Sequence, residues 1–129
     1  MPTSLPPAPR SLRYVGVLAC AAVILYASVL NPGKGTPETL FGVGVTVYLH
    51  VLAYAGFAGA VGYALLAADR RALLVAAGVS VLYGAGVELV QSFLSYRTMS
   101  AFDALVNAGG ATIGAALWWL VAPWFGAER

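Results

Sequence analysis

Residues 86–120 read GVELVQSFLSYRTMSAFDALVNAGGATIGAALWWL, two long apolar runs separated by a short polar segment. Each run is long enough to cross a bilayer as a helix, because roughly 20 apolar residues span about 30 Å of hydrocarbon. The stretch also carries five strongly polar side chains: Glu88, Gln91, Arg97, Asp103 and Asn107. A charged side chain inside the membrane costs roughly 2.5–3.5 kcal/mol on insertion scales. We therefore expect a membrane hairpin that holds a polar site.

The composition of the whole chain agrees with a membrane protein. Of its 129 residues, 60% are hydrophobic and only 9% are charged, and the mean hydropathy is +0.83. Soluble domains are typically about 25% charged, so this chain cannot cover a globule with polar surface. A net charge of +2 gives no reason to expect a nucleic-acid partner, and the single cysteine, Cys20, cannot form an internal disulfide.

The apolar runs predict an all-α protein with four transmembrane helices in an antiparallel bundle, because the joining loops are short. Closed β-barrels show short alternating segments, whereas the runs here are continuous, so no strands are expected. Residues 1–13, with four prolines and two arginines, are predicted to be a disordered basic tail, 14–121 the membrane domain and 122–129 a short C-terminal tail. The predicted helices are Tyr14–Leu30, Gly42–Ala67, Ala72–Leu94 and Ala101–Val121, separated by loops at 31–41 and 95–100 and by a polar turn at 69–71.

A cleaved signal peptide is the alternative for the first apolar run, since basic residues precede it. The run continues ten residues past Cys20, and no A-x-A-like site follows it closely, so a first transmembrane helix is favoured.

The basic residues predict the orientation, because cytoplasmic loops carry an excess of lysine and arginine. The two termini and the turn at 69–71 share one side of the membrane, and loops 31–41 and 95–100 share the other. The first side carries Arg10, Arg13, Arg70, Arg71 and Arg129, and the second carries Lys34 and Arg97. Both termini are therefore expected in the cytoplasm.

Three polar side chains on different helices are expected at similar depth from the outer face. With a rise of 1.5 Å per residue, His50 would lie roughly 12 Å deep, and Glu88 and Asn107 roughly 9 Å deep. Glu88 and Gln91 share one face of their helix, as do Asp103 and Asn107 on the next. Gly110 and Gly114 continue that second face as a G-x-x-x-G pattern, which favours close helix packing.

Simpler roles are open for most of these residues. Ser100 and Asp103 have the spacing of a capping box at the start of a helix. Gln91 and Asn107 would serve equally as hydrogen-bonding groups between helices, worth about 0.6–2 kcal/mol each. Arg97 would also suit a loop anchored at the headgroups, and His50 alone would suit an ordinary helix contact. Glu88 has the weakest structural explanation, because a membrane carboxylate is costly and glutamine would bond as well.

The pattern of polar residues resembles the VanZ-like family of small multi-helix membrane proteins, over about residues 45–118. A first element contains Tyr48, His50 and Tyr54. The second, more specific element contains Glu88, Gln91, Phe93, Arg97, Ser100, Asp103, Asn107, Gly110 and Gly114. The founding member is associated with teicoplanin resistance, but the family has no established biochemical activity, and the resemblance implies no resistance role here. Many relatives carry an Asp-Lys pair just before the histidine, where this chain has Thr46 and Val47.

These observations leave three main functions open, and a proton- or ion-coupled transporter, which would need a dimer at this chain length, is a weaker fourth. The first is a pocket for an amphiphilic or lipid-linked ligand at the outer leaflet, formed by His50, Tyr54, Glu88, Gln91, Arg97, Ser100, Asp103 and Asn107. The second is a membrane enzyme with His50, Glu88 or Asp103 as acid or base. The third is an accessory subunit of a membrane complex. Lipid is the expected partner, together with a possible homo-oligomer, and no cofactor or metal is expected because no H-E-x-x-H-type spacing is present.

Overall fold

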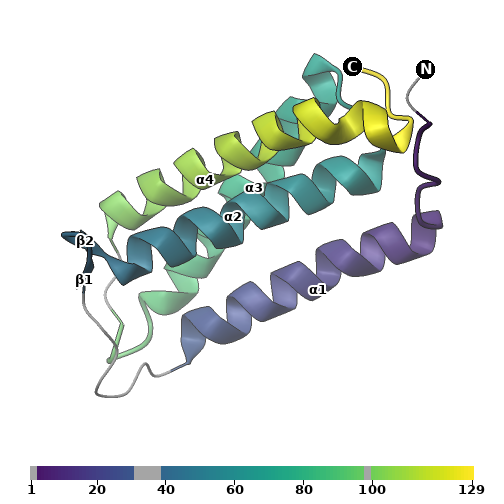
Figure 1. Cartoon of the computed structure of the whole chain (residues 1–129). Coiled ribbons are helices and arrows are strands. Elements are labelled where there is room, and N and C mark those ends of the chain that lie inside the picture. Colours follow the sequence, from purple (N-terminus) through teal and green to yellow (C-terminus); the bar gives the residue numbers. More distant parts are fainter. Residues whose placement is uncertain (1–2, 31–38, 98–99) are drawn as a thin grey trace.

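The computed structural model describes residues 3–30, 39–97 and 100–129 (Figure 1). Most of the predicted loop 31–41, including Lys34 and Glu38, lies outside these residues. The four long helices are α1 (Arg10–Val29), α2 (Val45–Leu65), α3 (Arg70–Gln91) and α4 (Ala101–Val121). Each is long and apolar enough to cross a membrane, which confirms the predicted four-helix membrane bundle.

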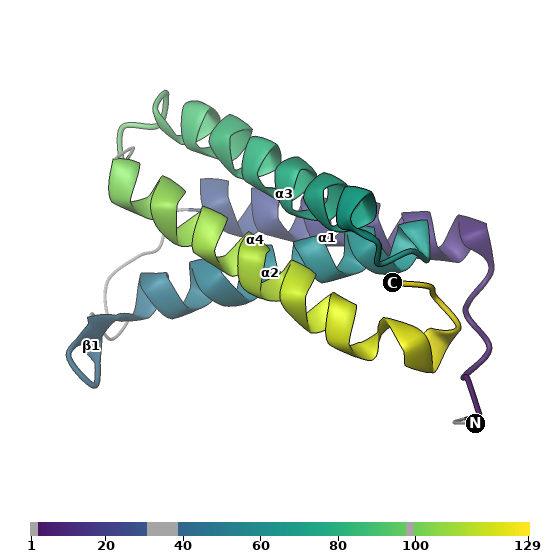
Figure 2. The same cartoon turned by 90° about the horizontal axis from the view of Figure 1, so that it is seen from above.

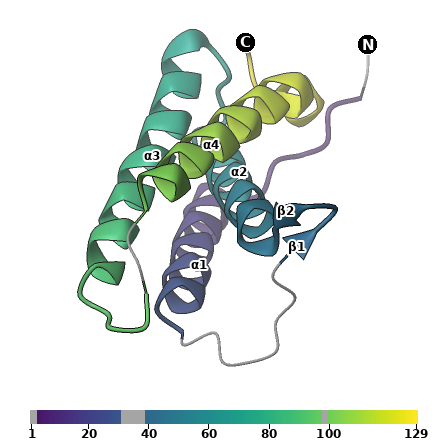
Figure 3. The same cartoon turned by 90° about the vertical axis from the view of Figure 1, so that its left-hand side faces the viewer.

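The second helix is the centre of the bundle, because it packs against the other three more extensively than any other helix does (Figures 2 and 3). The fourth helix packs against α2 and α3, and α1 lies against α2 and α3 on the other side. The described ends of the chain lie together at one end of the bundle, here called the termini end, opposite the loop end that carries β1 and β2 (Figure 1).

Several predicted boundaries need correction. The first helix begins at Arg10 rather than Tyr14, with Pro9 before it, so four residues assigned to the tail are helical. Proline favours helix starts because its missing N–H has no partner there in any case. The third helix begins inside the predicted polar turn, because the Asp69 side chain accepts a hydrogen bond from the Ala72 N–H at 2.8 Å and caps it. It ends three residues early, at Gln91.

A short antiparallel strand pair, which the sequence did not predict, precedes α2. The strands are β1 (Thr39–Leu40) and β2 (Val43–Gly44), so α2 starts at Val45 rather than Gly42. Both turn residues, Phe41 and Gly42, have positive φ angles of 52° and 76°. Positive φ at both central positions is the requirement of the type I′ turn that suits two-residue hairpins.

The pattern of burial differs from that of a soluble protein. The largest fully buried side chains are polar: Glu88, Asn107 and Ser80. Large apolar side chains on all four helices point outward instead, for example Leu18, Leu52, Leu82, Leu105 and Leu117. Lipid solvates these apolar side chains, so polar groups are the ones that must be sheltered and paired inside.

Glycines let α4 approach α2 closely. A Cβ atom on Gly110 would lie 2.8 Å from the carbonyl oxygen of Val51, and one on Gly114 would lie 2.7 Å from the Cα of Ala55. On α2, Gly62 faces the indole of Trp118, whereas Gly56 and Gly59 have open space beside them. Backbone contact of this kind supplies packing energy where the hydrophobic effect does not.

The termini end is closed by aromatic packing and main-chain hydrogen bonds. Trp118 is buried, donates its indole N–H to the Ala67 carbonyl at 2.9 Å, and packs on Tyr63 and Phe125. A 3₁₀ turn, η1 (Ala122–Phe125), ends α4 here. The N-terminal segment also contacts this end, because the Leu5 N–H bonds the Trp124 carbonyl and the Ala8 N–H bonds the Tyr63 hydroxyl.

Candidate functional site

A hydrogen bond between α2 and α4 lies at the centre of the polar cluster at the loop end. His50 Nδ1 lies 2.7 Å from Asn107 Oδ1, so a proton on Nδ1 would be donated to the amide oxygen. Asn107 is 2% exposed and His50 is half-buried. The bond sets the rotation of the imidazole and leaves Nε2 to accept a hydrogen bond.

Glu88 from α3 completes the cluster and is its most unusual member. Its side chain is 2% exposed, and among the described residues neither carboxylate oxygen has a hydrogen-bond partner. His50 and Asp103 lie close enough to act on its charge, and the Asn107 amide and the Ser100 main chain are its nearest hydrogen-bond donors. The amide nitrogen of Asn107 is likewise buried without a partner among the described residues. The carboxylate and this amide nitrogen therefore adjoin in the same interior without forming a well-aligned hydrogen bond to each other.

Tyr54 and Gly84 form the wall of the cluster toward the middle of the bundle. The His50 and Tyr54 ring centres are 6.3 Å apart. A Cβ atom on Gly84 would lie 2.9 Å from the Tyr54 ring and 3.2 Å from Asn107 Nδ2. Gly84 therefore makes room for both side chains. One turn deeper, the buried Ser80 hydroxyl donates to the Tyr54 carbonyl at 3.1 Å, so that polar group is paired.

Two members of the cluster, His50 and Glu88, lie nearer the ends of their helices than the sequence predicted. His50 is the sixth residue of α2, Glu88 lies three residues before the end of α3, and Asn107 is the seventh residue of α4. At 1.5 Å per residue, His50 and Glu88 lie about 8 and 5 Å from their helix ends, compared with the expected 12 and 9 Å, whereas Asn107 lies about 9 Å in, as expected. A polar head at the membrane interface would need to travel only one or two helical turns to reach them.

The structure places Gln91 and Arg97 away from this cluster, against the end of α1. The Gln91 amide donates to the Ser28 carbonyl at 2.9 Å. Arg97 donates to the carbonyls of Ala27 and Leu30 at 3.1 and 2.6 Å. The last carbonyls of any helix have no partner within that helix. The end of α1 is therefore capped by three side chains, here called the α1 cap: Gln91, Arg97 and Tyr96, whose hydroxyl bonds the Val29 carbonyl.

Ser100 and Asp103 lie at the entrance to α4, where both are half-buried. The Ser100 side chain is the N-cap and accepts a hydrogen bond from the Asp103 N–H at 3.4 Å. The Asp103 carboxylate lies close enough to Glu88 for the two negative charges to repel each other, so it borders the cluster. Of the predicted site residues, the structure thus gathers His50, Tyr54, Glu88, Asp103 and Asn107, with Ser100 at the rim.

The α1 cap is expected to hold α1 in place, because α1 has only one buried residue, Ile24, among its 20. Arg97→Gln should remove up to about 1 kcal/mol of docking energy, since net hydrogen bonds are worth about 0.5–1.5 kcal/mol. The native Cys20, half-buried on α1, should then react about fivefold faster with N-ethylmaleimide in detergent. Arg71→Gln, at the exposed start of α3, is the charge-matched control. An unchanged Cys20 rate in Arg97→Gln would show that α1 is held without this arginine.

Sequence reasoning missed Ser80, Gly84 and Tyr96, although a signal for two of them exists. Every fourth residue along α3 is buried: Ala72, Ala76, Ser80, Gly84 and Glu88. Residues four apart lie on one helical face, so a stripe of small residues leading to a carboxylate marks the interior face of α3. Tyr96 has no comparable signal, because its partner is a main-chain carbonyl of α1.

Comparison with known proteins identifies the family of this chain but no individual relative. No curated protein and no solved structure matches the chain. The family model described as VanZ/LLP1 matches residues 17–122, which include most of α1, the whole of α2, α3 and α4, and every residue of the polar cluster. Because that match covers most of the sequence, this four-helix membrane protein belongs to the VanZ/LLP1 family.

Proposed function

We propose that the polar cluster binds the head of an amphiphilic or lipid-linked ligand at the outer leaflet. The observation that carries this proposal is that the Glu88 carboxylate and the Asn107 amide nitrogen are buried side by side without a well-aligned hydrogen bond to each other or to any other described residue. Leaving a buried polar group unpaired costs about 1–3 kcal/mol, and more for a charged one. A ligand head that both donates to Glu88 and accepts from Asn107 would remove that cost, and a hydroxyl group does both.

An amphiphile fits the location of the cluster. The cluster lies about one or two turns from the helix ends, and the outer surface of the surrounding helices is apolar. The head of such a ligand would reach the cluster from the loop end while its tail remained in lipid. In this proposal, Asp103 and Ser100 border the entrance, and Arg97 acts indirectly by holding α1.

The proposed leaflet depends on the orientation of the chain. Arg10, Arg13, Arg70, Arg71 and Arg129 all belong to the termini end, so we expect that end in the cytoplasm. A cytoplasm-dependent reporter fused after Arg129 should therefore be active, and a reporter that works only outside the cell should be silent. The reverse pattern would move the cluster to the cytoplasmic leaflet.

The ligand test compares Glu88→Gln with Glu128→Gln, which makes the same change at an exposed position of the C-terminal segment. Protein in nanodiscs formed with total envelope lipids of the expression host would be examined by native mass spectrometry. Wild type and Glu128→Gln should retain the same specific amphiphile, and Glu88→Gln should lose at least about tenfold, as expected for a hydrogen bond to a charged group. The same unselective set of lipids on all three proteins would contradict the proposal.

One observation favours an acid–base enzyme as a second candidate. The Asn107 bond orients the His50 imidazole beside the Glu88 carboxylate, and paired titratable groups in one interior are typical of acid–base sites. An enzyme should convert the retained amphiphile, so a mass change on incubation of wild type, absent in His50→Gln, would favour this candidate over binding alone.

A further inference from the structure

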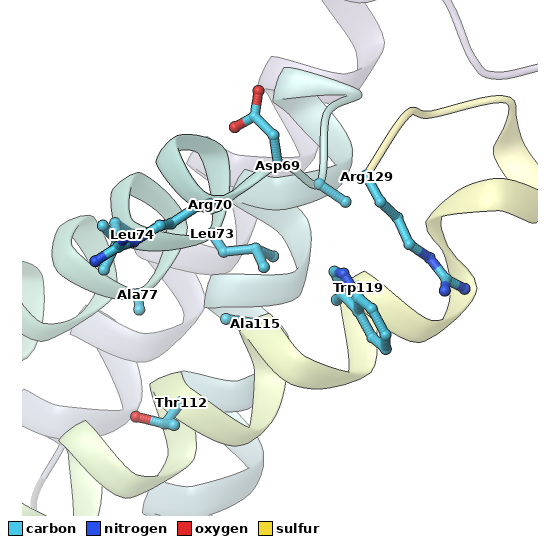
Figure 4. Close-up of a pocket in the computed structure, with 10 residues that line it drawn as sticks. Asp69, Arg70, Leu73, Leu74, Ala77, Thr112, Ala115, Trp119 and Arg129 are labelled. Carbon is cyan, nitrogen blue, oxygen red and sulfur yellow. The ribbon is translucent and has the colours of Figure 1, made fainter.

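A second site lies at the termini end, far from the polar cluster along the bundle. A groove of about 590 Å³ opens there between α3 and α4 (Figure 4). Its floor is apolar, formed by Leu73 and Ala77 of α3 and by Ala115 of α4. From Arg70 to Ala77 the groove follows two turns of helix, about 10 Å at 1.5 Å per residue. That length accommodates several methylene groups of an acyl chain.

Each wall of this groove carries an arginine. Arg70 extends from the first turn of α3 past Leu74 and away from Arg129, which lies over the ring of Trp119, 4.1 Å from its centre (Figure 4). This contact and a 3.4 Å hydrogen bond to the Leu120 carbonyl hold Arg129 beside α4. Within residues 3–30, 39–97 and 100–129, no ion pair engages either arginine. Both charges are therefore available to a ligand.

The groove also has one carboxylate in its lining, Asp69. Its side chain accepts from the Ala72 N–H and so faces the amino end of α3, whose dipole favours a negative charge. Figure 4 shows this carboxylate turned away from the floor residues Leu73 and Ala115. The electrostatic character of the groove mouth is therefore set by the arginines.

Chemistry restricts what could fill such a groove. A water-soluble anion would pair with the arginines but would leave the apolar floor uncovered. A second copy of the chain joined symmetrically at this surface would bring Arg70 and Arg129 of both copies together, and like charges in contact are unfavourable. A zwitterionic lipid would cover the floor but present its own cation to the arginines. An anionic phospholipid satisfies both parts of the groove.

We propose that this groove is a binding site for an anionic phospholipid, with an acyl chain along Leu73, Ala77 and Ala115, the phosphate beside Arg129, and Arg70 adding positive charge on the opposite wall. Trp119, 39% exposed beside the groove, suits the headgroup level that tryptophan prefers in membranes. The site is independent of the ligand proposed for the polar cluster, because it lies at the other end of the bundle and shares no residue with it.

The test is competition between two lipids that differ only in charge. Purified protein is incubated in detergent with equal amounts of palmitoyl-oleoyl phosphatidylglycerol and phosphatidylcholine, and native mass spectrometry counts each bound lipid. Wild type should favour phosphatidylglycerol, and Arg70→Gln/Arg129→Gln should lower that preference at least about fivefold, the effect expected of one arginine near a lipid surface. Arg10→Gln/Arg71→Gln removes the same charge from the same end outside the groove and should keep the preference.

A groove-filling variant separates the apolar part of the site from its charge. Ala77→Phe leaves all arginines in place but occupies the floor, and it should reduce bound phosphatidylglycerol severalfold. An equal loss of preference in the two double variants would attribute binding to the general charge of this end and overturn the proposal. So would a wild type without preference, or one whose groove is covered by a dimer that Ala77→Phe dissociates in size-exclusion chromatography with light scattering.

Discussion

Gly114→Ala is expected to destabilise the protein by about 2–3 kcal/mol, the upper part of the range for added volume in a packed interior. The new methyl group would overlap the carbonyl of Ala55 on α2, and its nearest carbon contact, the Ala55 Cα, would be at 2.7 Å. Main-chain atoms cannot rotate away as a side chain can, so α2 and α4 would have to separate. The melting temperature in detergent, followed by far-UV circular dichroism, measures the loss.

Gly109→Ala provides a matched control for this prediction. It is the same substitution on the same helix, but nothing lies within 4 Å of the added Cβ. Because alanine favours a helix over glycine by about 1 kcal/mol in water, this variant should be as stable as wild type or slightly more stable. Equal stability of Gly114→Ala and Gly109→Ala would mean that α2 and α4 do not pack closely.

Glu88→Met is expected to act in the opposite direction and to stabilise the protein by about 1–3 kcal/mol, the cost of an unpaired buried polar group. Methionine has a similar length and no hydrogen-bonding demand, so it would replace two orphaned carboxylate oxygens with apolar contacts. The same variant should lose the proposed ligand. Functional polar groups are often kept at a cost in stability. A gain in stability together with a loss of the ligand would show that Glu88 is such a group.

Ser80→Ala is the comparator for that experiment. Ser80 lies on the same buried face of α3, but its hydroxyl is paired with the Tyr54 carbonyl at 3.1 Å. Losing a satisfied hydrogen bond should cost about 0.5–1.5 kcal/mol. The two variants thus have opposite expected signs in one melting assay. A loss in Glu88→Met comparable to that in Ser80→Ala would make Glu88 a structural residue and remove the main support for the proposed ligand site.

The outcomes together would divide the polar residues by role. Arg97 and Gln91 bind main-chain carbonyls of α1, and their variants should affect how α1 is held. Glu88 and Asn107 retain unpaired atoms, and their variants should affect the ligand. His50 is both a structural contact and a candidate ligand contact, because it is bonded to Asn107 and remains half-buried at the edge of the cluster.

Sequence alone was sufficient for the membrane class and the number of helices. In lipid, an uninterrupted apolar run of about 20 residues forms a helix, because a helix satisfies its own main-chain hydrogen bonds. The start of α4 was predicted to the residue, because Ser100 is a local cap that needs no tertiary contact. The start of α2 and the end of α3 were predicted less accurately. The apolar runs reach Gly42 and Leu94 at these two boundaries, but the strand pair before α2 and the turn after α3 shorten both helices.

The partners of each helix face were decided only by the tertiary structure. Glu88 and Gln91 share a face of α3, yet one meets α2 and α4 while the other meets α1. Helical periodicity identifies which residues lie together on one helix but not which neighbour that face will meet. Lipid adds to the ambiguity, because the outside of this bundle is as apolar as its interior, and hydrophobicity therefore cannot mark the buried side. Close backbone approach at Gly110 and Gly114 and hydrogen bonding of interior polar groups settle the arrangement, and both exist only once the helices are packed.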